Sequence, residues 1–179
     1  MSGKRKILGI AGSLRNNSST ALLMKQATRL MPDDIEFTLY DGLGKLPHFD
    51  DSENRPEEVN RFCQMLANAD GVLIITPEYA FGVPGSLKNA LDWTVSSGEF
   101  VDKPLALITA STGGEKAFAA FLMIFTALSS DIPEHGKLLI SFIRSKIDAD
   151  GNFKDEVTYY DFKRAIDSLA ERIREKSRM

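Results

Sequence analysis

KILGIAGSLRNNSST, residues 6–20, joins a continuous apolar run to a loop of hydroxyl, amide and guanidinium side chains. An uninterrupted apolar run is typical of a strand buried on both faces of a parallel sheet. The loop after it could simply begin a helix, since the hydroxyl of Ser18 or Ser19 alone makes a good N-cap. It could also bind an anion, because free N–H groups and the helix dipole meet there. An N-cap has no use for Arg15, so we favour a phosphate.

The rest of the chain repeats this alternation of strand and helix. Apolar patterning predicts strands at residues 6–11, 35–40, 72–75, 105–110 and 138–143, and helices at 18–31, after Pro56, after Pro84, at 116–128 and near the C-terminus. Strands alternating with helices indicate a parallel sheet covered on both faces by right-handed crossovers. Five such units predict a flavodoxin-like, doubly wound α/β fold, and we expect residues 1–179 to form one domain.

Composition excludes several classes of function. The chain has 179 residues, 43% hydrophobic and 26% charged, with a formal net charge of −3, so nucleic acid is not an expected partner. Cys63 is the only cysteine, which excludes an internal disulfide and a thiolate metal cluster, and we expect it to be a buried core thiol. We expect no metal site. The first apolar run is too short for a signal peptide and no stretch could span a bilayer, so we expect a cytoplasmic protein.

Two further loops should lie at the same edge of the sheet as GSLRNNSST. TPEYAFGVPG, residues 76–85, follows the third strand and carries Tyr79 and Phe81, whose flat rings suit a planar heteroaromatic ligand. An ordinary crossover loop with packed aromatics is the alternative. ASTGG, residues 110–114, follows the fourth strand, and its small residues permit close backbone approach, although this signal alone is weak. A phosphate loop combined with two ring-contacting loops predicts FMN binding.

These motifs resemble those of the NADPH-dependent FMN reductase family, which includes chromate, quinone and azo-dye reductases. The resemblance rests on GSLRxxS and on TPEYxxxxPGxLKNAxDW, and it spans roughly residues 5–145. It implies noncovalent FMN, with NADPH or NADH as co-substrate. It also implies ping-pong hydride transfer to flavin N5 and on to a flavin, quinone, azo or metal-oxyanion acceptor. No side chain would act as a catalytic nucleophile, because the flavin carries the chemistry.

The resemblance also implies site residues. It implies that Ser13, Arg15 and Ser18 hold the FMN phosphate, that Pro77, Glu78 and Tyr79 line the ring, and that Ser111, Gly113 and Gly114 border it. By residue type and position, Ser19 and Thr20 join the phosphate set, and Ala80, Phe81 and Thr112 complete the ring set. Thr20 and Ala80 stand where the family usually has asparagine. For Glu78 we favour a structural role, in its own loop or against a partner subunit, over proton donation.

Residues 117–128, AFAAFLMIFTAL, form an expected helix with a single polar residue. A sheet covers only one side of a helix, so a partner subunit is the natural cover, and the family's dimers favour a homodimer or homotetramer. The alternative is a helix covered by long loops of its own chain. Two other functions also fit the residues: a flavodoxin-type FMN electron carrier without NAD(P)H turnover, and a ligand-binding or regulatory protein that has lost turnover.

Overall fold

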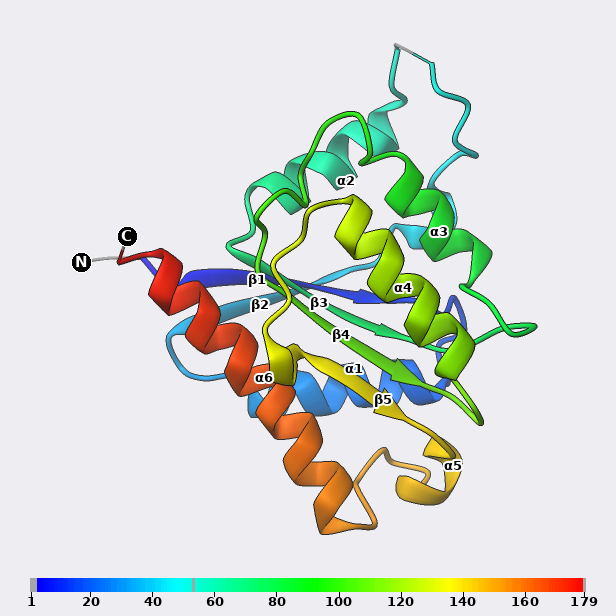
Figure 1. Ribbon diagram of the computed structural model, residues 1–179, viewed down its shortest axis with the longest axis vertical. Coiled ribbons are helices and arrows are strands. Elements are labelled where there is room, and N and C mark those ends of the chain that lie inside the picture. Colours follow the sequence, from blue (N-terminus) through cyan, green and yellow to red (C-terminus); the bar gives the residue numbers. More distant parts are fainter. Residues whose placement is uncertain (1–2, 53, 179) are drawn as a thin grey trace.

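The computed structural model describes residues 3–52 and 54–178 and contains one five-stranded sheet (Figure 1). All strand pairs are parallel and the strand order is β2-β1-β3-β4-β5. The strands are β1 (Arg5–Ala11), β2 (Ile35–Tyr40), β3 (Gly71–Thr76), β4 (Leu105–Ala110) and β5 (Lys137–Ile140). This is the predicted doubly wound α/β fold. Strand β2 is added on one side of β1 and the later strands on the other, so the strand order switches between β1 and β3.

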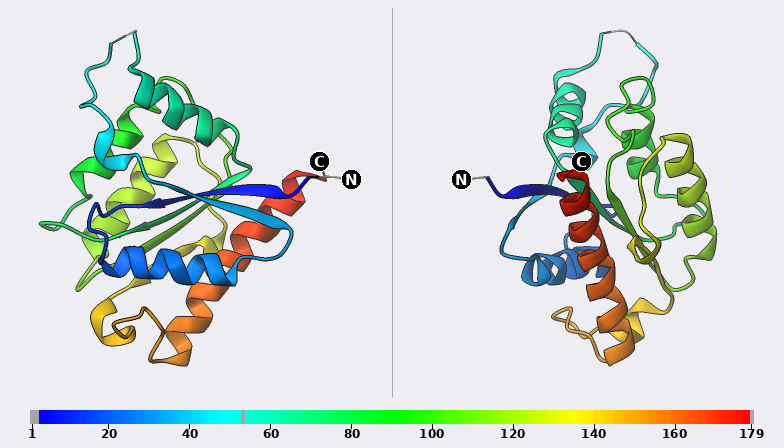
Figure 2. Two further views of the ribbon diagram at one scale, coloured as in Figure 1. Left: turned by 180° about the vertical axis from the view of Figure 1, so that it is seen from behind. Right: turned by 60° about the vertical axis from the view of Figure 1, so that its left-hand side comes forward.

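Helices cover both faces of the sheet, as the alternation of strands and helices predicts. Figure 2 shows α1 and α6 on one side and α2, α3 and α4 on the other. The α-helices are α1 (Ser19–Leu30), α2 (Glu57–Ala67), α3 (Gly85–Asp92), α4 (Glu115–Ala127), α5 (Ile143–Lys146) and α6 (Glu156–Lys176), and short 3-10 helices are η1 (Leu43–Lys45) and η2 (Glu134–Gly136).

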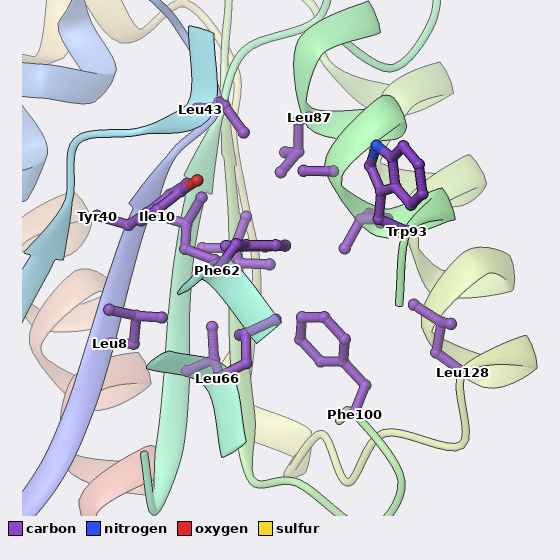
Figure 3. Packing of buried hydrophobic residues seen from close by; sticks show 14 of the residues in the cluster. Leu8, Ile10, Tyr40, Leu43, Phe62, Leu66, Leu87, Trp93, Phe100 and Leu128 are labelled. Atoms are coloured by element: carbon purple, nitrogen blue, oxygen red, sulfur yellow. The ribbon is translucent and has the colours of Figure 1, made fainter. Parts of the chain in front are cut away.

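Each face of the sheet has its own apolar core, because successive strand residues point to opposite sides. The larger core lies under α2, α3 and α4, where Phe62, Phe100 and Trp93 fill the space against the sheet (Figure 3). Cys63 belongs to this core, and burial raises the pKa of its thiol to about 11. The prediction of a buried core thiol is confirmed.

The run PGSLKNALDW holds a distant loop as well as forming α3. The Asn89 side chain accepts a hydrogen bond from the Phe49 N–H (2.8 Å) and donates to the Pro47 carbonyl (2.9 Å). The Trp93 indole N–H also donates to the Pro47 carbonyl, at 3.0 Å. Two side chains of one helix face thus fix the long connection between β2 and α2, which gives Asn89 and Trp93 a structural role.

The predicted fifth strand is too long. Residues 138–143 were expected to be extended, but β5 ends at Ile140 and the short helix α5 begins at Ile143. The reason is the backbone of Phe142, which has φ = 55° and therefore turns the chain out of the sheet. A left-handed phenylalanine is uncommon and leaves no sequence signal.

Helix α4 packs on the sheet with Ala117, Phe121 and Phe125, which are fully buried. On its outer side Met123 is 69% exposed, and Phe118 and Leu122 are only partly buried. Among the described residues, loops of the same chain therefore do not fully cover the outer side of α4, contrary to the alternative prediction. No described helix is long and apolar enough to cross a membrane. Within residues 3–52 and 54–178, no group of three or more metal-binding side chains is found.

Candidate active site

The carboxyl ends of four strands lie level with one another. The register pairs Ala11 with Ile75, Thr76 with Thr109, and Ala110 with Ile140. The loops after β1, β3, β4 and β5 therefore meet at one edge. This is the edge where open α/β sheets bind ligands, next to the switch in strand order.

These loops surround a cavity of about 380 Å³, within the range of small-molecule sites. Ten of its lining residues belong to the predicted site: Ser13, Arg15, Ser18, Ser19, Thr20, Pro77, Glu78, Tyr79, Ser111 and Thr112. Residues that the three predicted loops contribute thus come together in space. Four predicted residues are not among those that line the cavity, namely Ala80, Phe81, Gly113 and Gly114.

The loop after β1 caps α1 and also lines the cavity. Ser18 is the N-cap of α1, and its hydroxyl oxygen accepts from the Ala21 N–H at 3.2 Å. The Ser18 oxygen also lies 2.9 Å from the Thr20 hydroxyl. A hydroxyl has one proton and two lone pairs, so if Thr20 donates to Ser18, the Ser18 proton stays free for a ligand. Capping α1 therefore does not use all of the hydrogen-bonding capacity of Ser18. Thr20, which is buried, contacts the Ser18 hydroxyl and helps to hold it in place.

A side-chain hydrogen bond joins the first loop to the second. The Ser13 and Tyr79 hydroxyls lie 3.0 Å apart, and Ser13 also accepts from the Arg15 N–H at 3.3 Å. Ser13 is buried, whereas the Tyr79 side chain is about half exposed. Tyr79 therefore presents a ring to the cavity while its hydroxyl is held at the opposite loop.

The residues after Tyr79 form a tight turn. Tyr79 and Gly82 exchange both backbone hydrogen bonds, at 3.0 and 2.9 Å, and the two residues between them, Ala80 and Phe81, have φ of 48° and 57°. Two left-handed residues make a type I′ turn, which ordinarily selects Asn and Gly. The Phe81 side chain at its tip is 81% exposed. Left-handed residues with side chains are strained, and such strain gathers at functional sites.

Glu78 caps the N-terminus of α4. Its Oε2 accepts from the Ala117 N–H at 2.9 Å, whereas the N-cap residue Gly114 has no side chain to offer. A carboxylate is also favoured at the positive end of a helix dipole. This contact supports the structural interpretation of Glu78 and ties the loop after β3 to the helix after β4.

Sequence reasoning did not single out four residues that line the cavity, namely Asn17, Ala110, Ile143 and Arg144. Arg144 lies in α5, whose start is fastened to the loop after β4 by two backbone bonds: Phe142 N–H to the Thr112 carbonyl and Ile143 N–H to the Ser111 carbonyl, both 3.1 Å. The only available signal was its place just after the fifth strand. Among the residues that the structure describes, the guanidiniums of Arg15 and Arg144 have no acidic partner.

Comparisons with known proteins agree with this arrangement. A family model described as NADPH-dependent FMN reductase matches residues 5–142. A 2-hydroxy-1,4-benzoquinone reductase of a Burkholderia species is 35% identical over 96% of this chain and 97% of its own. An NAD(P)H-dependent FMN reductase of Pseudomonas aeruginosa is 34% identical over 87% of this chain and 88% of its own.

Solved structures give the same answer. The flavoenzyme NAD(P)H:(acceptor) oxidoreductase FerB from Paracoccus denitrificans superposes with a TM-score of 0.83 at 30% identity, covering 96% of this chain and 98% of its own. The match to the family model covers the loops after β1, β3 and β4, which form the cavity apart from the part lined by Ile143 and Arg144. The chain therefore belongs to the NADPH-dependent FMN reductase family.

Proposed function

We propose that this protein is an FMN-dependent NAD(P)H oxidoreductase that passes two electrons to a small-molecule acceptor. The observation that carries the proposal is the single cavity in which a phosphate-type loop, an aromatic loop and a small-residue loop meet. NAD(P)H would give up a hydride and leave as NAD(P)⁺, and the acceptor would then take two electrons at the same site, which is a ping-pong cycle. FMN, when bound, supplies this redox chemistry.

The residues of the cavity fit FMN. A phosphate monoester carries about −1.5 to −2 charges near neutral pH, and it requires hydrogen-bond donors and cations. The first loop offers the Ser18 and Ser19 hydroxyls and the unpaired Arg15 guanidinium at the positive end of α1. Pro77 and Tyr79 lie along the other wall and suit the ring. Glu78 Oε2 accepts from the Ala117 N–H, which holds this carboxylate at the N-terminus of α4.

The chain's own residues would bind and orient, since no side chain has to form a covalent bond. We propose that Tyr79 and Phe81 form the wall against which the nicotinamide or the acceptor stacks. Tyr79 reaches the cavity directly, and Phe81 stands exposed at the tip of the next turn, where a substrate could cover it. Backbone N–H groups of the loops after β3 and β4 would stabilise the charge of the reduced cofactor.

An anaerobic titration tests the proposal. The purified chain is loaded with FMN, titrated with NADPH and separately with NADH, and then mixed with a quinone, an azo dye, chromate or free FMN. Loss of the yellow absorbance followed by its recovery supports the enzyme. Binding of FMN without bleaching would favour an electron carrier, and no binding of FMN would overturn the proposal. The quinone arm has first priority, because a benzoquinone reductase is 35% identical over nearly the whole chain.

The stacking wall has its own test. Phe81→Ala should raise the KM for one substrate at least several-fold while the FMN affinity stays constant. Tyr79→Phe separates the ring from the hydroxyl that contacts Ser13, and Tyr160→Ala, a change at an exposed ring on α6, serves as control. Unchanged KM values for both substrates in Phe81→Ala and in the Tyr79→Ala, Phe81→Ala double variant would remove the wall from the proposal.

We also propose that the chain acts as one domain that forms a homodimer or homotetramer, with the outer side of α4 in the interface. The exposed Met123 and the half-buried apolar residues around it support this. Met123→Lys should shift the mass measured by light scattering toward the monomer, and an unchanged mass would count against this interface. The one cysteine is buried and free, which suits a reducing compartment such as the cytoplasm.

A further inference from the structure

We propose that Arg144 supplies a second guanidinium to the phosphate of bound FMN, in the same cavity as Arg15 but from a different loop. This inference rests on the proposed function, because it assumes that FMN occupies the cavity. Nothing in the family motifs covers this position, and residues 5–142, the part that the family model matches, end before it.

Arg144 belongs to the same cavity as the phosphate loop. Both line it, together with the hydroxyls of Ser18, Ser19 and Thr20 at the first turn of α1. The two arginines come from different places in the sheet. Arg15 follows β1, whereas Arg144 follows β5, and β3 and β4 lie between those strands. The cavity at the start of α1 is thus lined by cations from two separate loops.

The position of α5 is fixed by contacts on both of its sides. On one side the Phe142 and Ile143 N–H groups bind carbonyls of the loop after β4. On the other, Ile143 and Ile147 belong to the same apolar core as Leu23 of α1. The turn that follows α5 also lies against α1, where a Cβ at Gly151 would be 2.9 Å from the Leu22 Cβ. Arg144 is therefore carried by an element packed beside the first half of α1, the helix that begins at the phosphate loop.

The charge of the phosphate favours a second cation in the cavity, which Arg144 can supply. A phosphate monoester brings about −1.5 to −2 charges, whereas Arg15 contributes +1 and the end of a helix about +0.5. The Glu78 carboxylate also lines the cavity and contributes −1, so Arg15 and the helix end leave about +0.5, and one further guanidinium brings the total to about +1.5, close in magnitude to the charge of the phosphate. Since Arg144 has no acidic partner among the described residues, its charge is available. An arginine can also bind two phosphate oxygens at once, which a lysine cannot do with the same geometry.

The experiment compares FMN with riboflavin, which has the same ring and ribityl chain but no phosphate. Dissociation constants are measured from flavin fluorescence for the wild type and for Arg144→Ala. We expect the Kd for FMN to rise about five- to tenfold in Arg144→Ala, with the Kd for riboflavin unchanged. Arg144→Lys should restore part of the loss. Arg29→Ala removes the same charge from an exposed arginine in the last turn of α1, and it should leave both constants within twofold.

Several outcomes would overturn the inference. A Kd for FMN within twofold of wild type would do so, and so would an equal loss for FMN and riboflavin, which indicates a structural role. A raised KM for NADPH but not NADH, with FMN binding unchanged, would move Arg144 to the 2′-phosphate of the nucleotide. If riboflavin binds too weakly to measure, the salt dependence of FMN binding decides: an unchanged slope in Arg144→Ala contradicts the inference. If the wild type itself fails to bind FMN, the proposed function fails instead.

Discussion

Removing the carboxylate of Glu78 should destabilise the fold through α4. Ala117 is the third residue of α4, and its N–H is the group that an N-cap side chain ordinarily accepts from. Gly114 cannot do so, and Glu78 takes its place from a different loop. Loss of an N-cap side chain costs about 0.5–2 kcal/mol, and the interaction of a carboxylate with the helix dipole adds about 0.3–1 kcal/mol. Because Glu78 is half-buried, we expect Glu78→Ala to lose about 1–2 kcal/mol.

The loss can be measured by urea and thermal unfolding of the protein without flavin. An unfolding entropy of about 2.1 cal/mol/K per residue gives about 0.38 kcal/mol/K for 179 residues, so the expected fall in Tm is about 3–5 °C. Glu78→Gln keeps an oxygen acceptor and should lose less than half as much. Glu115→Ala is the matched control, since it removes a charge from the same helix end without removing the bond to Ala117.

Two results would refute this reasoning about Glu78. The first is a Glu78→Ala variant that unfolds within about 0.3 kcal/mol of the wild type, since the lower limit for losing a cap is about 0.5 kcal/mol. The second is a Glu78→Gln variant of normal stability and normal FMN binding that reduces the flavin with NADPH but fails to pass electrons on. That pattern would assign the carboxyl to proton donation.

Three further changes test other parts of the structure. Gly12→Ala should abolish FMN binding or folding, because a Cβ there would lie 2.3 Å from Thr76 Oγ1 and 3.0 Å from its Cα; near-normal Tm and FMN Kd would contradict this close approach. Ala80→Asn should raise the free energy of unfolding by about 0.5–1 kcal/mol, since asparagine tolerates the left-handed region; a lower Tm would count against the turn. The Arg174 guanidinium, which donates to both Asp34 carboxylate oxygens, holds the Asp34 pKa below its ordinary value. The Asp34–Arg174 pair therefore stabilises the fold above about pH 4, and this stabilisation is lost as the pH falls further. We expect Asp34→Asn to be less stable than the wild type at pH 7 and equally stable near pH 2. Equal stability of the two proteins at both pH values would contradict a stabilising role of this pair.

The part of the cavity that the loop after β1 lines could be predicted because its residues lie close together in the sequence. Ser13 to Thr20 follow one strand, so locating the strand located the loop and its hydroxyls. The contribution of the loop after β3 could be predicted only in part. Tyr79 lines the cavity as expected, but the type I′ turn places Ala80 and Phe81 outside its lining, and nothing in their residue types signals a left-handed backbone. Because Ala80 and Phe81 stand where a type I′ turn usually has Asn and Gly, the sequence does not indicate this turn.

Arg144 shows a different limit. Its position depends on where β5 ends, and β5 ends early because Phe142 adopts a conformation that phenylalanine seldom takes. The same conformation lets the backbone after β5 bind the Ser111 and Thr112 carbonyls. These contacts join residues that lie about 30 positions apart, so local patterning carries no trace of them. A site made by loops that follow several strands can be predicted only as well as the end of each strand can be located in the sequence.

The Ser13–Tyr79 hydrogen bond makes the two halves of the site depend on each other. The Ser13 oxygen has two lone pairs and one proton, and the Arg15 N–H already donates to one lone pair. If the Ser13 proton is given to a phosphate oxygen, the Tyr79 hydroxyl must donate to the remaining lone pair at their 3.0 Å contact. The direction of that hydrogen bond is then fixed, and the tyrosine is held in one orientation. A phosphate bound after β1 would thereby order the aromatic ring after β3, so the anchor of the cofactor would also prepare the surface on which its substrate stacks.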